Sequence, residues 1–66
     1  MTAEADIYRA AKLIIDQNGD GAADFADRRL LVLLDKHDLN GVTIWRRILE
    51  AIVELQRKRA PGELLN

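Results

Sequence analysis

Several residue types are absent or scarce in this chain of 66 residues, and each absence excludes a class of protein. There is no cysteine, so the chain can form neither disulfide bonds nor thiolate metal sites. There is also no serine, and an acyl-transfer nucleophile would have to be a threonine, neither of which lies near a base in the sequence. A chain this short has no room for a deep pocket. We therefore expect a protein that is not an enzyme and uses no cofactor.

The chain also lacks a large excess of either positive or negative charge. Ten basic residues stand against eleven acidic ones, a formal net charge of −1, which argues against nucleic acid or an anionic membrane as the partner. The acidic N-terminus lacks the pattern of a signal peptide, and the longest apolar run, Leu30 to Leu34, is too short to cross a bilayer. We expect a cytoplasmic protein.

The sequence does contain helical periodicity, in the segments 3–18, 21–36 and 41–59. In the first segment the apolar stripe is built on Ile7, Ala11 and Ile14. Asn18-Gly19 ends it, because both residues tolerate the left-handed conformation that follows a helix. Pro61-Gly62 ends the third segment. We predict one all-α domain, residues 1–66, folded as a three-helix bundle with a short frayed C-terminal tail.

The second and third segments have broad apolar faces. The side chains predicted to face inward from the second are Ala23, Ala26, Leu30, Leu33, Leu34 and His37. Those predicted for the third are Trp45, Ile48, Leu49, Ile52, Val53 and Leu55. Asp38 or Asn40 is expected to cap the third helix. Asp24 and Arg28, four residues apart on the outer side of the second, are placed to form an ion pair.

The turn from Leu30 to Leu34 is apolar on nearly all sides, which the surface helix of a monomer rarely needs. Leu31 and Val32 lie outside the stripe of the second segment, and Ile44 lies beside the stripe of the third. So short a chain buries only about 60% of its unfolded surface and has few elements to cover these residues. We therefore predict a homodimer, or another protein partner, with Leu31, Val32 and Ile44 in the interface.

Twelve consecutive residues, Asp16 to Asp27, follow the ligand order of a helix–loop–helix calcium site. The ligand positions hold Asp16, Asn18, Asp20, Asp24 and Asp27, and Gly21 holds the position of the sharp turn. However, aspartate replaces the bidentate glutamate at the last position, two arginines occupy apolar positions of the exiting helix, and no second loop follows. A helix that starts near Gly21 with Asp20 as its cap explains the same residues. Calcium binding is the alternative, and we predict no metal.

A second alternative is DNA binding through a helix–turn–helix between Leu30 and Ile48. Gly41 would serve the turn, and Thr43, Arg46 and Arg47 would open the recognition helix. However, each arginine has a glutamate within two turns, which weakens the field that a phosphate would meet. We therefore do not expect nucleic acid as the partner.

An ordered set of residues also carries a family resemblance. The set is Asp6-Ile7-Tyr8-Arg9-Ala10-Ala11, Gly19-Asp20, Ala22, Ala23, Ala26, Arg29, Leu33-Leu34, Asp38, Gly41, Trp45, Ile48, Ala51 and Leu55. In these residues the chain resembles a family of small uncharacterised bacterial proteins that is widespread in proteobacteria. The resemblance implies a short all-helical protein without known catalytic or ligand residues. The chain departs from the family pattern at Leu30 to Val32, where apolar residues replace a small residue followed by acidic ones, and this departure favours self-association.

Overall fold

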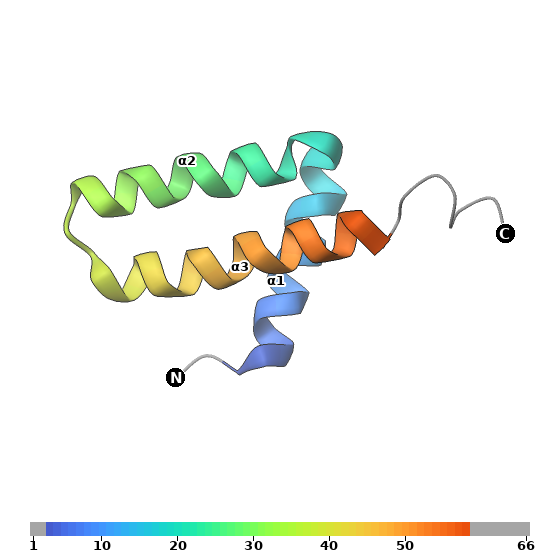
Figure 1. Cartoon of the computed structure of the whole chain (residues 1–66), viewed down its shortest axis with the longest axis horizontal. Helices are drawn as coiled ribbons and strands as arrows, with labels where there is room; N and C mark the ends of the chain where they lie inside the picture. Colours follow the sequence, from blue (N-terminus) through green and yellow to red (C-terminus); the bar gives the residue numbers. More distant parts are fainter. Residues whose placement is uncertain (1–2, 59–66) are drawn as a thin grey trace, which may run out of the picture.

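The computed structural model describes residues 3–58, which form helices and contain no strand (Figure 1). The elements in chain order are α1 (Glu4–Asn18), one 3₁₀ turn η1 (Gly19–Gly21), α2 (Ala22–Asp35) and α3 (Leu39–Lys58). The predicted all-α class is confirmed. The first two helices lie within one residue of their predicted ends, whereas α3 begins two residues earlier than predicted. Pro61-Gly62 and the predicted tail lie outside the described residues.

The end of α1 depends on a glycine conformation. Gly19 has a φ of 56° and a ψ of −127°, and its N–H donates to the carbonyl oxygen of Ile15. Residues with a side chain rarely adopt this backbone conformation. The helix thus ends at Asn18-Gly19 as predicted, but the ψ of Gly19 lies outside the left-handed helical region on which the prediction rested. The Asn18 Nδ2 donates back to the Ile14 carbonyl at 2.9 Å. From α3, the Gln56 Nε2 donates to the carbonyl oxygen of Gly19 at 2.9 Å and ties the turn to the last helix.

The end of α2 uses a residue other than glycine in the left-handed region. His37 has a φ of 59°, its N–H donates to the Leu34 carbonyl at 3.0 Å, and the N–H of Asp38 donates to the Leu33 carbonyl at 2.9 Å. These two bonds define a Schellman motif, which turns the chain out of the helix. The prediction that His37 faces inward from the second helix was therefore wrong: it lies after α2 and is exposed.

The start of α3 is capped by Asp38, as predicted. Its Oδ1 accepts a hydrogen bond from the N–H of Gly41 at 3.0 Å, and its carbonyl oxygen accepts one from Val42 at 2.9 Å. A Cβ atom at Gly41 would lie 2.7 Å from the Asp38 Oδ2 and 3.1 Å from the Leu33 Cδ2. Glycine therefore allows the cap to close over the first turn of α3 while α2 packs beside it.

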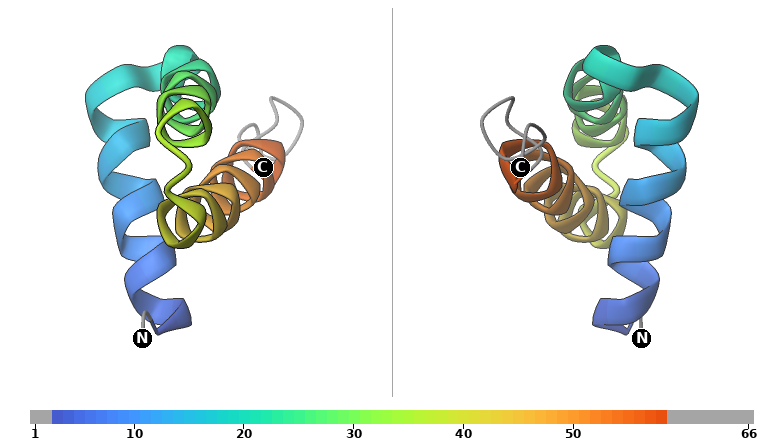
Figure 2. Two further views of the ribbon diagram at one scale, coloured as in Figure 1. Left: turned by 90° about the vertical axis from the view of Figure 1, so that its left-hand side faces the viewer. Right: turned by 90° about the vertical axis from the view of Figure 1, so that its right-hand side faces the viewer.

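The three helices do not run side by side along one direction. α2 and α3 form an antiparallel hairpin, and α1 crosses behind this hairpin at a steep angle (Figures 1 and 2). The core lies at the crossing and contains Ile7, Ala11, Ile14, Ile15, Ala22, Ala26, Ile48, Ala51 and Ile52. The four alanines leave little side chain between the helices at the crossing, which allows a close approach.

The crossing changes which predicted core residues are covered. Leu34 and Val53, predicted to face inward, are 50% and 41% exposed. Ala22, Val42 and Ala51 are buried although they were absent from the predicted set. The reasons differ: α1 crosses the hairpin away from the end of α2 that holds Leu34, whereas Val53 lies about 100° around α3 from the buried Ile52 and points away from the core.

Candidate functional site

The segment from Asp16 to Asp27 is helical throughout and contains no twelve-residue loop. Asp16 and Asn18 belong to the last turn of α1, Asp20 to η1, and Asp24 and Asp27 to α2, and all five are exposed. The second helix starts next to Gly21, as predicted, but Gly21 rather than Asp20 is its N-cap residue, without a side-chain cap bond. No three His, Asp or Glu side chains in residues 3–58 are grouped so that they could hold a metal ion. The converging carboxylates of a calcium loop are thus not formed in this arrangement.

The helix–turn–helix alternative predicted Gly41 in a turn before a recognition helix. Gly41 lies inside α3, and α2 and α3 run antiparallel, whereas the helices of such a motif meet at about 90–120°. Thr43, Arg46 and Arg47 are exposed on α3. The Thr43 hydroxyl donates to the Leu39 carbonyl at 3.0 Å, a bond within the helix.

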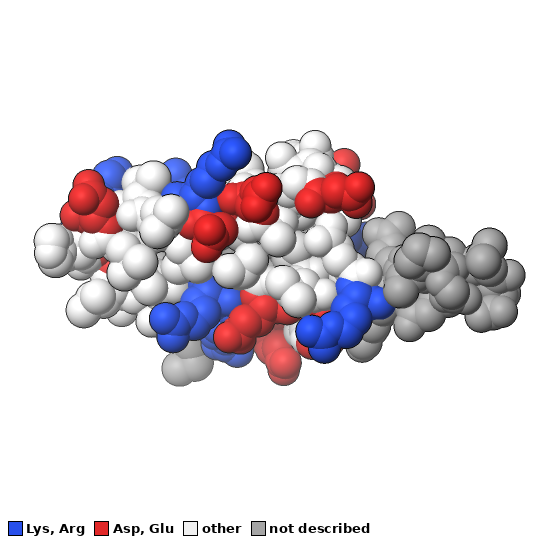
Figure 3. Space-filling model, turned by 45° about the horizontal axis from the view of Figure 1, so that its top comes forward, with Lys and Arg blue, Asp and Glu red and all other residues white. Residues whose placement is uncertain are grey.

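Large apolar side chains remain exposed on all three helices. They are Leu13, Phe25, Leu31, Val32, Leu34, Leu39 and Val53. Four of them belong to α2, which is therefore the helix with the most apolar surface left uncovered. Figure 3 shows an uncharged surface along α2 and α3 between two rows of charged side chains.

The three residues predicted as an interface occupy different surfaces. Leu31 is 60% exposed and Val32 is 45% exposed, but consecutive residues of a helix point about 100° apart. Leu31 shares a flank of α2 with Leu34, three residues later, whereas Val32 shares the other flank with Phe25, seven residues earlier. Ile44 is half-buried and packs against the core cluster. Their role in an interface stays a prediction.

On the first of these flanks, Leu30, Leu31 and Leu34 form a continuous surface that we name the α2 leucine patch. Leu30 is half-buried, and the other two are at least half exposed. Three charged residues border the patch, and all are exposed: Asp27 and Arg28 lie four and three residues before Leu31, and Asp35 lies four residues after it. An ion pair joins Asp6 and Arg9 at 3.6 Å. The predicted pair of Asp24 and Arg28 does not form.

The other flank of α2 contacts Trp45 of α3. The rings of Phe25 and Trp45 have centroids 6.2 Å apart at an interplanar angle of 51°, and the Arg29 guanidinium carbon lies 5.9 Å from the centroid of the Trp45 ring. Trp45 is half-buried, and the two α2 side chains lie against it. The cluster was not predicted from the sequence, although the four-residue spacing of Phe25 and Arg29 places both on one side of a helix.

A hydrogen bond joins α1 to α3. The Tyr8 hydroxyl donates to the Glu54 carboxylate, at 3.1 Å to Oε1 and 2.9 Å to Oε2. This hydrogen bond, together with partial burial and the negative charges of Glu54 and Glu4, raises the pKa of Tyr8 above its usual value. The bond borders a hollow of about 200 Å³ that Arg47 and Glu50 also line. The two residues are 46 positions apart, and no periodic pattern in the sequence connects them.

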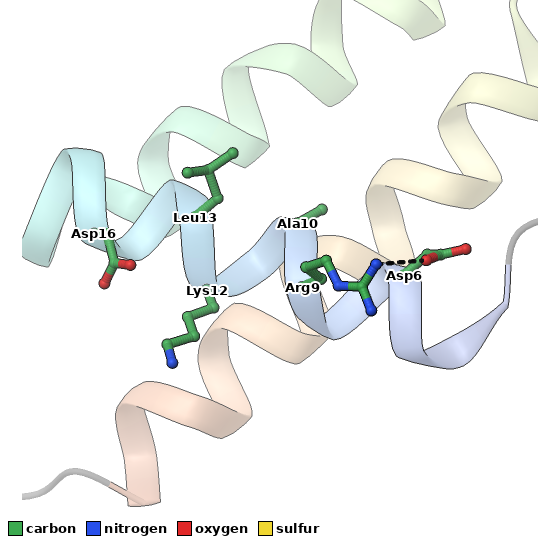
Figure 4. A pocket seen from close by; sticks show the side chains of 6 residues that line it. All are labelled: Asp6, Arg9, Ala10, Lys12, Leu13 and Asp16. Atoms are coloured by element: carbon green, nitrogen blue, oxygen red, sulfur yellow. Dashed lines mark ion pairs between the residues drawn. The ribbon is translucent and has the colours of Figure 1, made fainter.

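The outer face of α1 carries an open hollow of about 470 Å³ (Figure 4). Ala10 and Leu13 form its apolar part, and the Asp6–Arg9 ion pair lies at one end. The described residues that line it all come from one helix, so among them polar groups do not converge as they do in a small-molecule site.

Comparison of the chain with protein-family models, with curated proteins and with solved structures gave no match. In the part of the chain that the structure describes, no helix combines the length and the hydrophobicity that crossing a bilayer requires.

Proposed function

We propose that this chain is a non-enzymatic helical domain that works through protein contacts and forms a homodimer through the α2 leucine patch. The observation that carries the proposal is the exposure of Leu31 and Leu34 on one flank of α2, next to Leu30. Each buried leucine contributes about 1.5–3 kcal/mol relative to an exposed one, so covering the patch stabilises an assembly. A second copy of the chain is the occupant that offers the same leucines in return.

The size of the patch supports a weak dimer. α2 has 14 residues and is about 21 Å long, so two such helices in contact bury less than about 1,200 Å², as in transient complexes. We expect a dissociation constant on the order of 10–100 μM. The apolar residues from Leu30 to Val32 also mark the departure from the resembled family, which supports self-association as a property of this chain.

The absence of enzymatic activity is part of the same proposal. The chain has neither serine nor cysteine, and His37 is exposed in the turn after α2. The hollow between α1 and α3 has a volume of only about 200 Å³, and the described lining of the α1 hollow comes from a single helix. Such surfaces do not exclude water or align a nucleophile with a base.

The test is analytical ultracentrifugation of the wild type, Leu31→Glu and Val32→Glu between about 5 and 300 μM, a range that brackets the expected constant. Leu31→Glu places a charge inside the α2 leucine patch and should leave a folded monomer. Val32→Glu is the matched control, because it adds the same charge to the other flank of the same helix and should dimerise like the wild type.

Circular dichroism shows whether both variants keep their helices, which the exposure of both positions favours. A wild type that stays monomeric at about 300 μM would contradict the proposed dimer. Equal self-association of the wild type and Leu31→Glu would show that the interface lies outside the patch.

A further inference from the structure

We infer that the proposed dimer forms through both helices of the hairpin, with Leu49 and Val53 of α3 as the second half of its contact surface. This wider interface rests on the dimer proposed above and adds residues of a second helix to it. Its basis is that Leu49, Val53 and the α2 leucine patch lie on one face of the hairpin, opposite α1. We name this surface the hairpin face.

The α2 leucine patch faces away from α1. In Figure 1, α2 runs from right to left above α3, and α1 lies behind both helices. The buried row of α2 is Ala22, Ala26 and Leu33, which points down toward α3. In a right-handed helix that runs in this direction, Leu30 and Leu34 lie about 60° and 100° further around than this row. They therefore face the viewer of Figure 1, on the side opposite α1.

Leu49 and Val53 face the same way on α3. The side of α3 that meets α1 holds Ala51, which borders the hollow between the two helices, and Glu54, which accepts the hydrogen bond of Tyr8. Val53 lies about 160° around α3 from Ala51, and Leu49 lies about 40° from Val53. Val53 is 41% exposed and Leu49 is half-buried. The apolar surface of α3 thus continues that of α2.

The hairpin face is an uncharged band with charged side chains along both of its edges (Figure 3). By their positions around the helices, the exposed charged residues beside it are Asp24, Asp27, Arg28 and Asp35 on α2, and Arg46, Glu50 and Arg57 on α3. Both edges carry both signs, which favours neither a strongly acidic nor a strongly basic partner. A second copy, with a formal net charge of −1, meets this mixed rim with a mixed rim of its own.

The area that a specific dimer buries calls for both helices. Contact between two α2 helices alone buries less than about 1,200 Å², the lower limit of specific interfaces. The stretch of α3 beside α2 is about as long as α2, and packed helices lie about 8–10 Å apart, so the hairpin face is about twice as wide as one helix. Two such faces bury on the order of 1,200–1,600 Å², within the specific range. The half on α3 supplies the missing area.

The experiment measures the dissociation constants of the wild type, Val53→Glu and Val32→Glu by analytical ultracentrifugation. Val53→Glu places a charge on the α3 half of the hairpin face, and the dissociation constant should rise at least about tenfold. Val32→Glu is the matched control: the same substitution is made at a similar exposure, 45% against 41%, but on the flank of α2 away from this face. Its dissociation constant should equal that of the wild type.

A second measurement does not require a charge at the interface. The chain has no cysteine, so Val53→Cys and Val32→Cys each carry a single thiol. Alkylation of Val53→Cys by a maleimide should be at least about twofold slower per thiol at 300 μM protein than at 5 μM, because the dimer covers the residue. Alkylation of Val32→Cys should proceed at the same rate at both concentrations.

The outcomes distinguish a wider interface from the absence of any dimer. A wild type that does not self-associate overturns both the dimer and the wider interface. A dimer that Leu31→Glu disrupts but Val53→Glu leaves unchanged keeps the proposed function and overturns the role of α3. If Val53→Glu loses its helical circular dichroism, the alkylation of Val53→Cys decides. A rate that does not depend on concentration overturns the wider interface, and a slower rate at high concentration supports it.

Discussion

At the scale of single residues, the helices end and begin where a particular side chain, or the lack of one, allows the backbone conformation of a turn. Gly19 and His37 both have positive φ, and they follow α1 and α2. At the start of α3, the carboxylate of Asp38 lies where it would collide with a Cβ atom at position 41, so the cap requires glycine there. These positions govern where helices end and carry no ligand contact.

Gly19→Ala should destabilise the domain by about 1–2 kcal/mol, because alanine is strained at the Gly19 conformation. Gly21→Ala is the matched control: Gly21 has a φ of −86°, and a Cβ at either glycine meets no atom within 4 Å. The control should be neutral or more stable by up to about 1 kcal/mol. Urea denaturation of the two variants measures the difference, and equal losses would show that the conformation of Gly19 does not limit stability.

At the scale of elements, side-chain hydrogen bonds fasten α1 and its turn to α3. One is the Tyr8–Glu54 bond and the other runs from Gln56 to the carbonyl of Gly19. α2 is held against α3 by apolar contacts and by the cluster of Phe25, Arg29 and Trp45. The Tyr8–Glu54 bond therefore makes the pairing of α1 with α3 sensitive to pH.

The Tyr8–Glu54 bond should make stability fall at high pH. The folded state raises the pKa of Tyr8 above the unfolded value of 10.0, so it holds the phenol proton more tightly than the unfolded chain does. The stabilising effect is complete below pH 10 and is lost as pH rises through the pKa of the folded state. Tyr8→Phe should be less stable than the wild type at neutral pH, and the difference should shrink above pH 10.

Denaturation of both proteins between neutral pH and about pH 11.5 measures this difference, and every other titratable group is common to both. Tyr8 is the only tyrosine, so phenolate absorbance of the wild type reports its pKa directly. The midpoint should lie higher in the folded protein than in denaturant. A pKa that is the same in both states would mean that the bond to Glu54 does not persist in solution.

At the scale of the whole molecule, stability depends on a small core at one crossing. A chain of this length has a free energy of unfolding of only about 3–10 kcal/mol. The core is built largely from isoleucine and alanine, and Trp45 closes its edge beneath Phe25 and Arg29. The free energy lost with one large side chain is therefore a large fraction of the total free energy of unfolding.

Trp45→Ala should lower the free energy of unfolding by about 2–3 kcal/mol, less than for a fully buried tryptophan because Trp45 is half-buried. Phe25→Ala should cost less, because Phe25 is 44% exposed and packs on the outside of the ring. Thermal unfolding followed by circular dichroism measures both. A larger loss of stability for Phe25→Ala than for Trp45→Ala would show that Trp45 is not the more buried of the two side chains.

Local chemistry made the ends of the elements predictable. Asn18-Gly19 and Asp38 act on backbone groups within a few residues of themselves, so their effect does not depend on the rest of the fold. The candidate site was predictable in part: Leu31 is exposed as expected, but Val32 belongs to the opposite flank and Ile44 packs against the core. The periodicity of apolar residues gives their angles around one helix, but it does not give the place where another helix crosses it.

The sequence by itself determined the helical class, the turn after α1, the cap of α3 and the apolar excess of α2, because all four arise from neighbours along the chain. The tertiary structure alone decided that α1 crosses the hairpin, and this crossing leaves Leu34 exposed while it buries Ala22 and Ala51. It alone joined Tyr8 to Glu54, residues 46 positions apart. Contacts over such separations follow from the angle at which helices pack, and that angle is set by side chains of several helices at once.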